Sequence, residues 1–387
     1  MAITDLTGVY AVLMIGPTIP APVPESLANA VESIEVKNTD EGRDGFQIVF
    51  SVGRGGAQNP TENPLDYSFV DNPLLNSFNR VIIMVAFGLL PTVLIDGVIT
   101  HKQFNPSAEP GQSKLTITGE DVSVMMDRKE KSTTHPNQPD MAIVSKIIAS
   151  YGQYGLVPAV MPPASMDTPM MVNRIPAQEA TDLQYIKSLA EAYDYVFYVE
   201  PTQAPGVNKA YWGPRGYTGV PQKALTVNMG AETNITGINF QYSSLDSTIV
   251  TGSVQDPTFN AKIPVIIAGS LRPPLSSSPD LLTNFANAKI KQYRAEGGVN
   301  VLQAYNEAQS ETDGSTDAVT VTGELDGVLY GDILRARRLV GLRGVGYLHD
   351  GYYYVKNVTH RIKKGEYKQA FTLTREGLGS TTPVVTP

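Results

Sequence analysis

The sequence predicts a mainly β fold with α+β insertions, and three observations support this fold class. Apolar and polar residues alternate along much of the chain, which is typical of half-buried strands. A hairpin pattern near residue 100 recurs near residue 360, which indicates two related β-modules. The chain of 387 residues is also too long for one core, and it should divide into roughly two to four domains.

The repeated hairpin uses the same layout twice. Its first strand carries an apolar residue, a threonine, a histidine and a cation, from Ile99 to Lys102 and again from Val358 to Arg361. Its second strand alternates apolar residues with threonine, from Leu115 to Thr118 and again from Phe371 to Thr374. This layout predicts a duplicated module, and three copies of such a chain would present six similar modules in a ring.

Residues 1–125 are expected to form the first β-module. Residues 46–52 alternate between apolar and other side chains, and Gly53 to Pro64 is a polar loop rich in Gly, Asn and Pro. The apolar stretch from Val81 to Ile95 is interrupted at Gly88 and falls short of the ~20 residues that span a bilayer, so it indicates two buried strands around a turn. Closing this sheet into a small barrel or sandwich would remove its exposed edges.

Residues 126–230 are expected to form a small α+β domain. Asp140 is a good helix N-cap, and Gly152 should end the helix that follows it. A second helix opens with the capping box Thr181 to Gln184, and this helix runs directly into the aromatic strand Tyr195 to Val199.

The second β-module is expected over residues 231–262 and 315–378. Residues 263–314 between them are interpreted as a helical insertion, because Ser278-Pro279 opens a helical pattern that Gly297-Gly298 ends. The acidic, Ser/Thr-rich stretch from Ser310 to Asp317 is expected to be a loop that rejoins the module. The last residues, 379–387, are expected to form a flexible tail.

The composition excludes several classes of function. With 42% apolar and 18% charged residues, the chain has an ordinary globular composition. The net charge of -8 argues against a specific nucleic-acid surface, which needs a concentrated basic face. The absence of cysteine excludes disulfides, thiolate metal sites and cysteine nucleophiles.

The N-terminus lacks the basic region of a signal peptide, and its apolar run from Tyr10 to Ile15 is cut short by Gly16-Pro17. We therefore expect neither export by the general secretory route nor membrane insertion. A product that works outside the cell would leave by lysis or as part of a particle.

Candidate catalytic and metal-binding residues do not form a recognisable pattern, so we name no catalytic, cofactor or metal site. The acidic pairs Glu120-Asp121 and Asp326 with Asp332 fall near turns, where carboxylates are usually solvated or capping. The segment from Gly341 to Gly346 looks like a phosphate loop but lacks the strand-to-helix context and a following Lys-Ser/Thr. None of the four histidines has a ligand spacing, and these are His101, His135, His349 and His360.

Two further clusters carry binding hypotheses. The arginines Arg335, Arg337 and Arg338 could touch DNA in a lumen or an acidic neighbour, although an intersubunit salt bridge or a solvated strand is favoured. A sugar-stacking platform could be built from aromatic residues, although consecutive tyrosines alternate faces and at least one belongs in the core. The residues of this platform would be Trp212, Tyr347, Tyr352, Tyr353 and Tyr354.

The order of these pieces resembles the late control protein D and T-even phage hub family, the baseplate hub proteins of contractile phage tails and injection systems. The resemblance rests on four segments in the family's order: the first β-module, the helix near residue 140, residues 178–191 with the aromatic strand, and the hairpin from Tyr354 to Arg375. It covers nearly the whole chain, and its motifs are structural patterns instead of catalytic signatures.

The resemblance implies a homotrimer in which each subunit supplies two tube-like β-barrels. The pseudo-sixfold ring would adapt a trimeric spike to the hexameric inner tube, beside other baseplate proteins, with no enzyme activity and no cofactor. The chain ends soon after its last hairpin, so the spike is expected to be a separate chain. The protein would be assembled in the bacterial cytoplasm and become part of a phage tail, a tailocin or another injection particle.

Two alternatives stay open at this point. A β-rich carbohydrate-binding or hydrolytic tail-tip protein would use the aromatic residues, and a hub with its own cargo-binding role would use the same assembly. Oligomeric state separates the first alternative from the hub, because a hub that does not trimerise cannot adapt symmetry.

Overall fold

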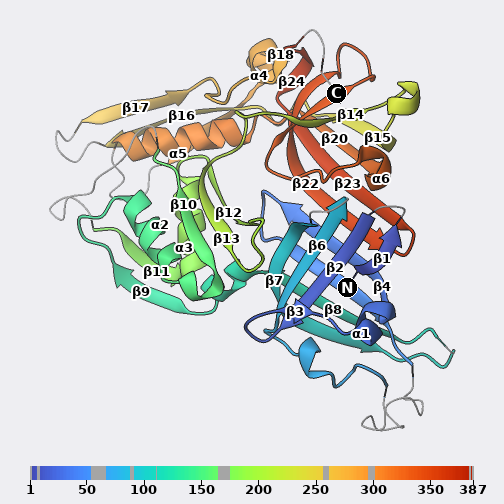
Figure 1. Cartoon of the computed structure of the whole chain (residues 1–387). Helices are drawn as coiled ribbons and strands as arrows, with labels where there is room; N and C mark the ends of the chain where they lie inside the picture. Colours follow the sequence, from blue (N-terminus) through green and yellow to red (C-terminus); the bar gives the residue numbers. More distant parts are fainter. Residues whose placement is uncertain are drawn as a thin grey trace.

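The computed structural model describes residues 2–6, 9–53, 67–87, 91–109, 111–163, 175–255, 261–294, 301–382 and 385. It confirms a mainly β chain whose largest element is a 14-stranded sheet shared by the two ends of the sequence. Figure 1 shows these ends, in blue and red, side by side, with the green and orange segments forming separate units. Residues 54–64, Gly88 and Gly297-Gly298, which carried sequence predictions, lie outside the described residues.

The first β-module forms one half of the large sheet, in the order β1-β2-β6-β7-β8-β5-β4. The expected pair of buried strands around residue 88 is confirmed as β6 and β7. Its elements are β1 (Ala2–Leu6), β2 (Val9–Gly16), β3 (Ala21–Pro22), α1 (Glu25–Ala30), β4 (Val31–Thr39), β5 (Gly45–Ser51), β6 (Arg80–Phe87), β7 (Pro91–Asn105) and β8 (Lys114–Asp121).

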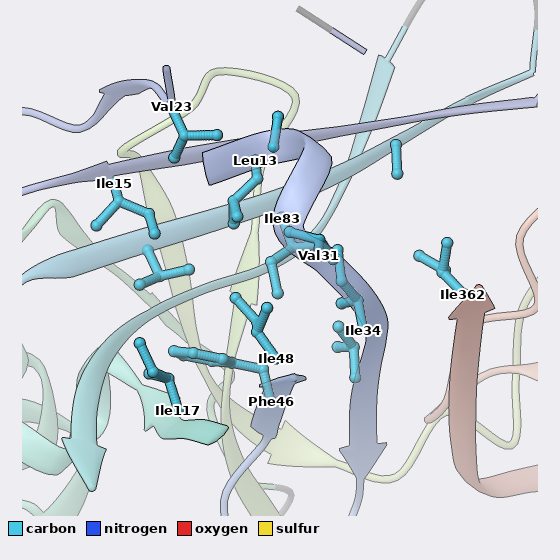
Figure 2. Packing of buried hydrophobic residues seen from close by; sticks show 14 of the residues in the cluster. Leu13, Ile15, Val23, Val31, Ile34, Phe46, Ile48, Ile83, Ile117 and Ile362 are labelled. Carbon is cyan, nitrogen blue, oxygen red and sulfur yellow. The ribbon is translucent and has the colours of Figure 1, made fainter. Parts of the chain in front are cut away.

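The first module curls around a single core. Leu13 in β2 and Ile34 in β4 belong to the same buried cluster, although β6, β7, β8 and β5 lie between their strands in the sheet order. A flat sheet would hold these two strands about 24 Å apart at ~4.8 Å per strand, so the sheet must bend back on itself. Figure 2 shows both side chains pointing into one cluster with Ile48 and Ile83.

The α+β domain has its own core around Trp212, which is fully buried and donates from its indole Nε1 to the Ile186 carbonyl at 3.3 Å. Two small sheets, β10-β13-β12 and β11-β9, pack with two helices. The elements are β9 (Glu130–Thr134), α2 (Asp140–Ala149), β10 (Leu156–Val160), β11 (Ala177–Thr181), α3 (Asp182–Glu191), β12 (Tyr195–Pro201) and β13 (Asn208–Pro214).

Of the two helix N-caps predicted for this domain, one is confirmed and one is wrong. Thr181 caps α3 as expected, because its hydroxyl accepts from the Gln184 backbone N–H at 3.3 Å. The prediction that Asp140 is an N-cap is wrong, because Pro139 holds the extended cap position and Asp140 is the first helical residue. The Asp140 carboxylate instead accepts from the Tyr193 hydroxyl at 2.8 Å.

The second β-module completes the large sheet in the order β22-β23-β20-β15, with β21 also on β22 and β14 on β21. Its core is a separate buried cluster that contains Val321, Val355, Phe371 and Leu373. The elements are β14 (Gln222–Thr226), β15 (Ile235–Tyr242), β20 (Val319–Asp326), α6 (Gly327–Tyr330), β21 (Leu339–Arg343), β22 (Gly351–Lys363) and β23 (Glu366–Arg375).

The segment between β15 and β20 forms a three-stranded sheet, β17-β16-β19, covered on one face by helix α5. Arg272 ties this unit to the α+β domain through two 2.9 Å bonds to the Asp194 carboxylate. The elements are β16 (Thr248–Gln255), β17 (Lys262–Ile267), β18 (Ser276–Pro279), α4 (Asp280–Thr283), β19 (Lys289–Arg294) and α5 (Val301–Gly314).

Two sequence predictions in this segment are wrong. The helix expected from Ser278 onward lasts only for α4, and Lys289–Arg294 is strand β19, because those residues pair with β16 in parallel. The loop expected from Ser310 to Asp317 is helical up to Gly314, because Ala304 and Ala308 bury the inner face of α5 against the sheet.

The boundaries of the second module stay a prediction, although strand pairing bears on them at two places. Strand β16 pairs with β17 and β19 and therefore joins the inserted sheet, whose start the sequence put at residue 263. The first two residues of the expected tail, Gly379 and Ser380, lie in β24 (Gly377–Ser380), which pairs with β18. In the described part of the chain, no helix combines the length and apolar character needed to cross a membrane.

Candidate assembly surface

The two β-modules repeat one strand arrangement. The order β6-β7-β8-β5-β4 in the first module matches β21-β22-β23-β20-β15 in the second, and both sets run in the same chain order. Every neighbouring pair in both sets is antiparallel. The modules differ outside this set, because β2 is antiparallel to β6 whereas β14 is parallel to β21.

Two β-bulges occupy the same places in both modules. Thr100 is the extra residue of β7 opposite β8, and Lys356 is the extra residue of β22 opposite β23. Glu32 is the extra residue of β4 opposite β5, and Thr236 is the extra residue of β15 opposite β20. Bulges are positioned features that fix register, so their coincidence relates the modules residue by residue.

This register corrects the residue matching expected from the sequence. The bulges align Thr100 with Lys356, so His101 corresponds to Asn357 and not to His360. His101 is exposed, whereas His360 is 1% exposed and its Nδ1 lies 2.9 Å from the Tyr367 hydroxyl. Burial lowers the pKa of His360 to about 3, so this histidine is neutral and belongs to the core.

The modules join edge to edge where β4 pairs with β22. Seven antiparallel pairs connect these strands, from Thr39 opposite Asn357 to Ser33 opposite Lys363. The inward residues of this ladder, such as Val36 and His360, are 0% and 1% exposed. One continuous sheet therefore runs through both modules.

A buried ion pair supports the same joint. The Arg337 guanidinium binds both oxygens of the Asp44 carboxylate, with an Nη1 to Oδ2 distance of 3.2 Å, and Arg337 and Asp44 are 7% and 2% exposed. Arg337 also donates through Nε to the Thr39 carbonyl at 3.0 Å and lies 4.1 Å from the centre of the Tyr198 ring. This one side chain thus contacts both modules and the α+β domain.

Asp40 is a second buried acid at the joint. Its backbone N–H donates to the carbonyl of the bulge residue Lys356 at 3.0 Å, and its carboxylate lies 4.0 Å from Arg215 Nε. Burial raises the pKa of Asp40 to about 6, against the opposing effects of Arg215 and Lys356. The joint therefore holds a buried acid whose pKa lies well above that of an ordinary carboxyl group.

The sequence-predicted acids and the glycine loop have structural roles. Asp121 accepts from the backbone N–H groups of Asp44 and Ser123, and burial with the nearby Asp44 charge raises its pKa to about 6. Asp326 caps α6, and Asp332 accepts from the Ile333 N–H. The Gly341 to Gly346 segment is the end of β21 followed by a turn, so it has no helix N-terminus for a phosphate.

The four histidines lie in different parts of the structure and in different surroundings. His135 is buried and stacks on Tyr185 at 5.8 Å, and the His349 ring lies 4.5 Å from the Phe240 ring. Across the described residues, no group of three His, Asp or Glu side chains is placed to hold a metal ion.

The residues of the arginine cluster, and those of the aromatic cluster, lie in different surroundings in the structure. Arg338 pairs with Glu200 of the α+β domain at 2.6 Å, which is a bridge within the chain, and the expected intersubunit bridge stays a prediction. Tyr353 and Tyr354 are 0% and 1% exposed, and Trp212 lies in another core, so these residues form no shared platform. Tyr347 alone among the five is strongly exposed, at 73%.

The fold is shared with solved phage tail proteins. A tail protein from Neisseria meningitidis MC58 has a TM-score of 0.64 at 13% identity, covering 96% of this chain and 98% of that chain. The 43 kDa tail protein of prophage MuSo2 from Shewanella oneidensis has a TM-score of 0.65 at 12% identity, covering 95% of this chain and 98% of that one.

A similar fold occurs in the Francisella PdpA-VgrG complex, with a TM-score of 0.55 at 12% identity, where the match covers 99% of this chain and 55% of that chain. No protein-family model matches the sequence, and no curated protein matches it significantly. The expected likeness to phage tail proteins is thus confirmed at the level of the fold.

Proposed function

We propose that this chain is the baseplate hub of a contractile injection apparatus, a non-enzymatic homotrimer that adapts a trimeric spike to the hexameric inner tube. The observation that carries the proposal is the duplicated module, with its shared strand order and two matching bulges, inside one continuous sheet. Three chains with two equivalent modules each present six similar units to a sixfold partner, while the rest of each chain keeps threefold symmetry. The shared fold with phage tail proteins supports the same role.

The proposed partners are those that this geometry would suit. The six modules would meet the inner tube hexamer, and the threefold parts would meet a trimeric spike, with other baseplate proteins around them. The proposed place of action is a virion tail or another injection particle assembled in the bacterial cytoplasm. The alternative of a sugar-binding tip loses its support, because Tyr353, Tyr354 and Trp212 are buried.

The test is the mass of the purified chain by light scattering, alone and after coexpression with its spike and tube partners. A trimer of the 41.8 kDa chain, about 125 kDa, is expected, with ring-shaped particles in electron micrographs. A chain that stays monomeric even beside its partners would contradict the proposal.

A further inference from the structure

Three units of the chain meet around a cavity of about 350 Å³. The first module supplies Thr92 at the start of β7. The α+β domain supplies Glu200 from β12 and Lys209 from β13. Arg335 and Arg338, which precede β21, come from the second module. Small-molecule sites in proteins often form where domains meet, in cavities of roughly 300–1,000 Å³, and this cavity lies at the lower end of that range.

The charged side chains of this cavity are mostly cationic. Lys209, Arg335 and Arg338 carry positive charges, and Glu200 is the one acid among the described lining residues, so the lining has a net of two positive charges. The chain as a whole has a net charge of -8. A cationic cavity in an acidic protein indicates a negatively charged ligand, because the protein walls concentrate the field of the three cations.

The single carboxylate satisfies only one of the three cations. Glu200 Oε1 lies 2.6 Å from Arg338 Nη2 and 3.7 Å from Arg335 Nη1. Lys209 faces Glu200 across the β12–β13 ladder, but its ammonium forms no ion pair with the residues that the structure describes and lies 5.3 Å from the centre of the Tyr211 ring. Arg335 and Lys209 are therefore left without a close counterion.

Arg335 has the donors that an oxyanion needs. Its backbone N–H and C=O are held by the Gln222 side chain at 2.8 and 2.9 Å, whereas its guanidinium makes no hydrogen bond within the described ranges. Burial and the nearby charge of Arg338 lower the pKa of Arg335, against the opposing effects of Glu200 and Asp332. The backbone of Arg335 is thus fixed while its donors remain free, and a planar guanidinium can bind two oxygens of one phosphate.

We propose that this cavity binds a phosphate group, either free or as the phosphate ester of a small molecule, between Arg335 of the second module and Lys209 of the α+β domain. A phosphate ester carries about 1.5–2 negative charges at pH 7, which offset the two cations that Glu200 leaves without a close counterion. Thr92 adds a hydroxyl donor from the first module. The bound group bridges three units of one chain, so the inference does not depend on the proposed trimer.

The test is isothermal titration calorimetry of the full chain with inorganic phosphate and, separately, with glycerol 3-phosphate. Both titrations are made at pH 7 and constant ionic strength, since salt screens charges that are open to solvent. Saturable binding of one anion per chain is expected for at least one of the two probes. Tighter binding of inorganic phosphate identifies the free ion as the preferred form, and tighter binding of glycerol 3-phosphate identifies the ester.

The variants should change the affinity in opposite directions. Arg335→Gln and Lys209→Gln should each weaken binding by about tenfold or more, because each removes a charged hydrogen-bond donor. Glu200→Gln should strengthen binding, because it removes the carboxylate that competes with the anion. The matched control is Arg361→Gln, which should bind as the wild type does, since the Arg361 side chain is 49% exposed and pairs with acids outside the cavity.

Saturable binding that weakens in Arg335→Gln and Lys209→Gln and tightens in Glu200→Gln supports the site. Binding that neither Arg335→Gln nor Lys209→Gln weakens places the anion elsewhere and overturns the proposal, as does the absence of saturable binding at millimolar concentrations of both probes. Circular dichroism checks that each variant folds, and Lys209→Gln, at an exposed position of β13, keeps the test available if Arg335→Gln does not fold. The mass of the chain is a separate measurement, so a failure here leaves the hub proposal standing.

Discussion

At the scale of single residues, Arg337 shows how one side chain connects distant parts of the chain. Its guanidinium is buried with Asp44 of the first module, although Arg337 itself precedes β21 of the second. Removing one partner of a buried ion pair leaves the other charge uncompensated, which typically costs about 3–5 kcal/mol. Replacing both partners by apolar residues costs much less than the two single losses together.

We therefore expect Arg337→Met to lower the free energy of unfolding by about 3–5 kcal/mol, and Arg337→Met with Asp44→Leu to cost less than the sum of the single changes. Denaturant unfolding followed by circular dichroism measures both. The control is Arg338→Met, since Arg338 pairs with Glu200 near the surface and should change stability by under ~1 kcal/mol. Additive losses at Arg337 and Asp44 would contradict a coupled pair.

Asp40 gives a prediction for pH. Burial raises its pKa from 3.8 to about 6, so between these values the folded chain binds more protons at this site than the unfolded chain. Stability from this group is therefore present at low pH and is lost as pH rises from about 4 to about 6, by roughly 3 kcal/mol. Asp40→Asn should remove this loss and make the variant relatively more stable at pH 7.

The measurement is the unfolding free energy of the wild type and Asp40→Asn between pH 4 and 7. The wild-type curve also contains His360, whose lowered pKa acts with the opposite sign by costing stability as pH falls below about 6.5. For that reason, the difference between the two curves is the useful quantity. Glu35→Gln is the control, because the Glu35 side chain is 51% exposed and Glu35 is not among the groups that shift the pKa of Asp40. A similar curve difference for Glu35→Gln would contradict the assignment to Asp40.

At the scale of strands and helices, two glycines with different surroundings test the packing of the sheet. Gly119 in β8 lies opposite Phe46 in β5, and a Cβ there would come within 2.3 Å of both the Phe46 ring and the Val98 carbonyl oxygen. Gly237 in β15 also lies in a strand, but a Cβ there meets nothing within 4 Å.

Gly119→Ala should therefore destabilise the first module by about 1–3 kcal/mol or more, since overpacking a filled core forces ring and backbone shifts. Gly237→Ala should stay within about 0.5 kcal/mol of the wild type. Thermal unfolding of both variants compares them directly, and equal losses would show that close packing at Gly119 is not the cause.

The strand alternation and the N-cap at Thr181 were readable from the sequence because each depends on neighbours along the chain. The hairpin repeat was also readable, but its residue matching was wrong by three positions on the first strand. The shared Thr-His pattern suggested that match, whereas the true correspondence is fixed by long-range strand pairing and by the bulges at Thr100 and Lys356, which leave no sequence signature. Helix α5 was partly missed because small Ala304 and Ala308, instead of large apolar residues, face the inserted sheet.

At the scale of the whole molecule, the module repeat predicts which segment can be deleted while the large sheet still forms. In the first module, a five-residue turn from Asp40 to Asp44 joins β4 to β5. The equivalent connection in the second module is residues 243–318, which carry the inserted sheet and α5. The same strand geometry therefore accepts either a short turn or a folded unit.

A chain in which residues 243–318 are replaced by a copy of residues 40–44 should keep its sheet and its oligomeric state. Far-ultraviolet circular dichroism and light scattering measure these two properties. A replacement by five glycine and serine residues is the control for the turn sequence. Loss of the β-rich spectrum in both variants would show that the inserted unit is required for the second module to fold.

The joint of the modules was beyond sequence reasoning, because the residues that build it are far apart in the chain. Nothing local to Arg337 indicates Asp44 as its partner, and β4 and β22 meet across more than 300 positions. The burial of Tyr353, Tyr354 and Trp212 was likewise decided by tertiary packing. These residues therefore lie in separate cores and do not form the sugar-stacking platform that the sequence suggested.

The continuous sheet also has a mechanical consequence. Ladder hydrogen bonds run perpendicular to antiparallel strands. A pull along the strand direction therefore loads the seven residue pairs between β4 and β22 together in shear, whereas a pull across the sheet would peel them apart in succession. A force applied to one module along its strands is therefore transmitted to the other module through all seven pairs at once.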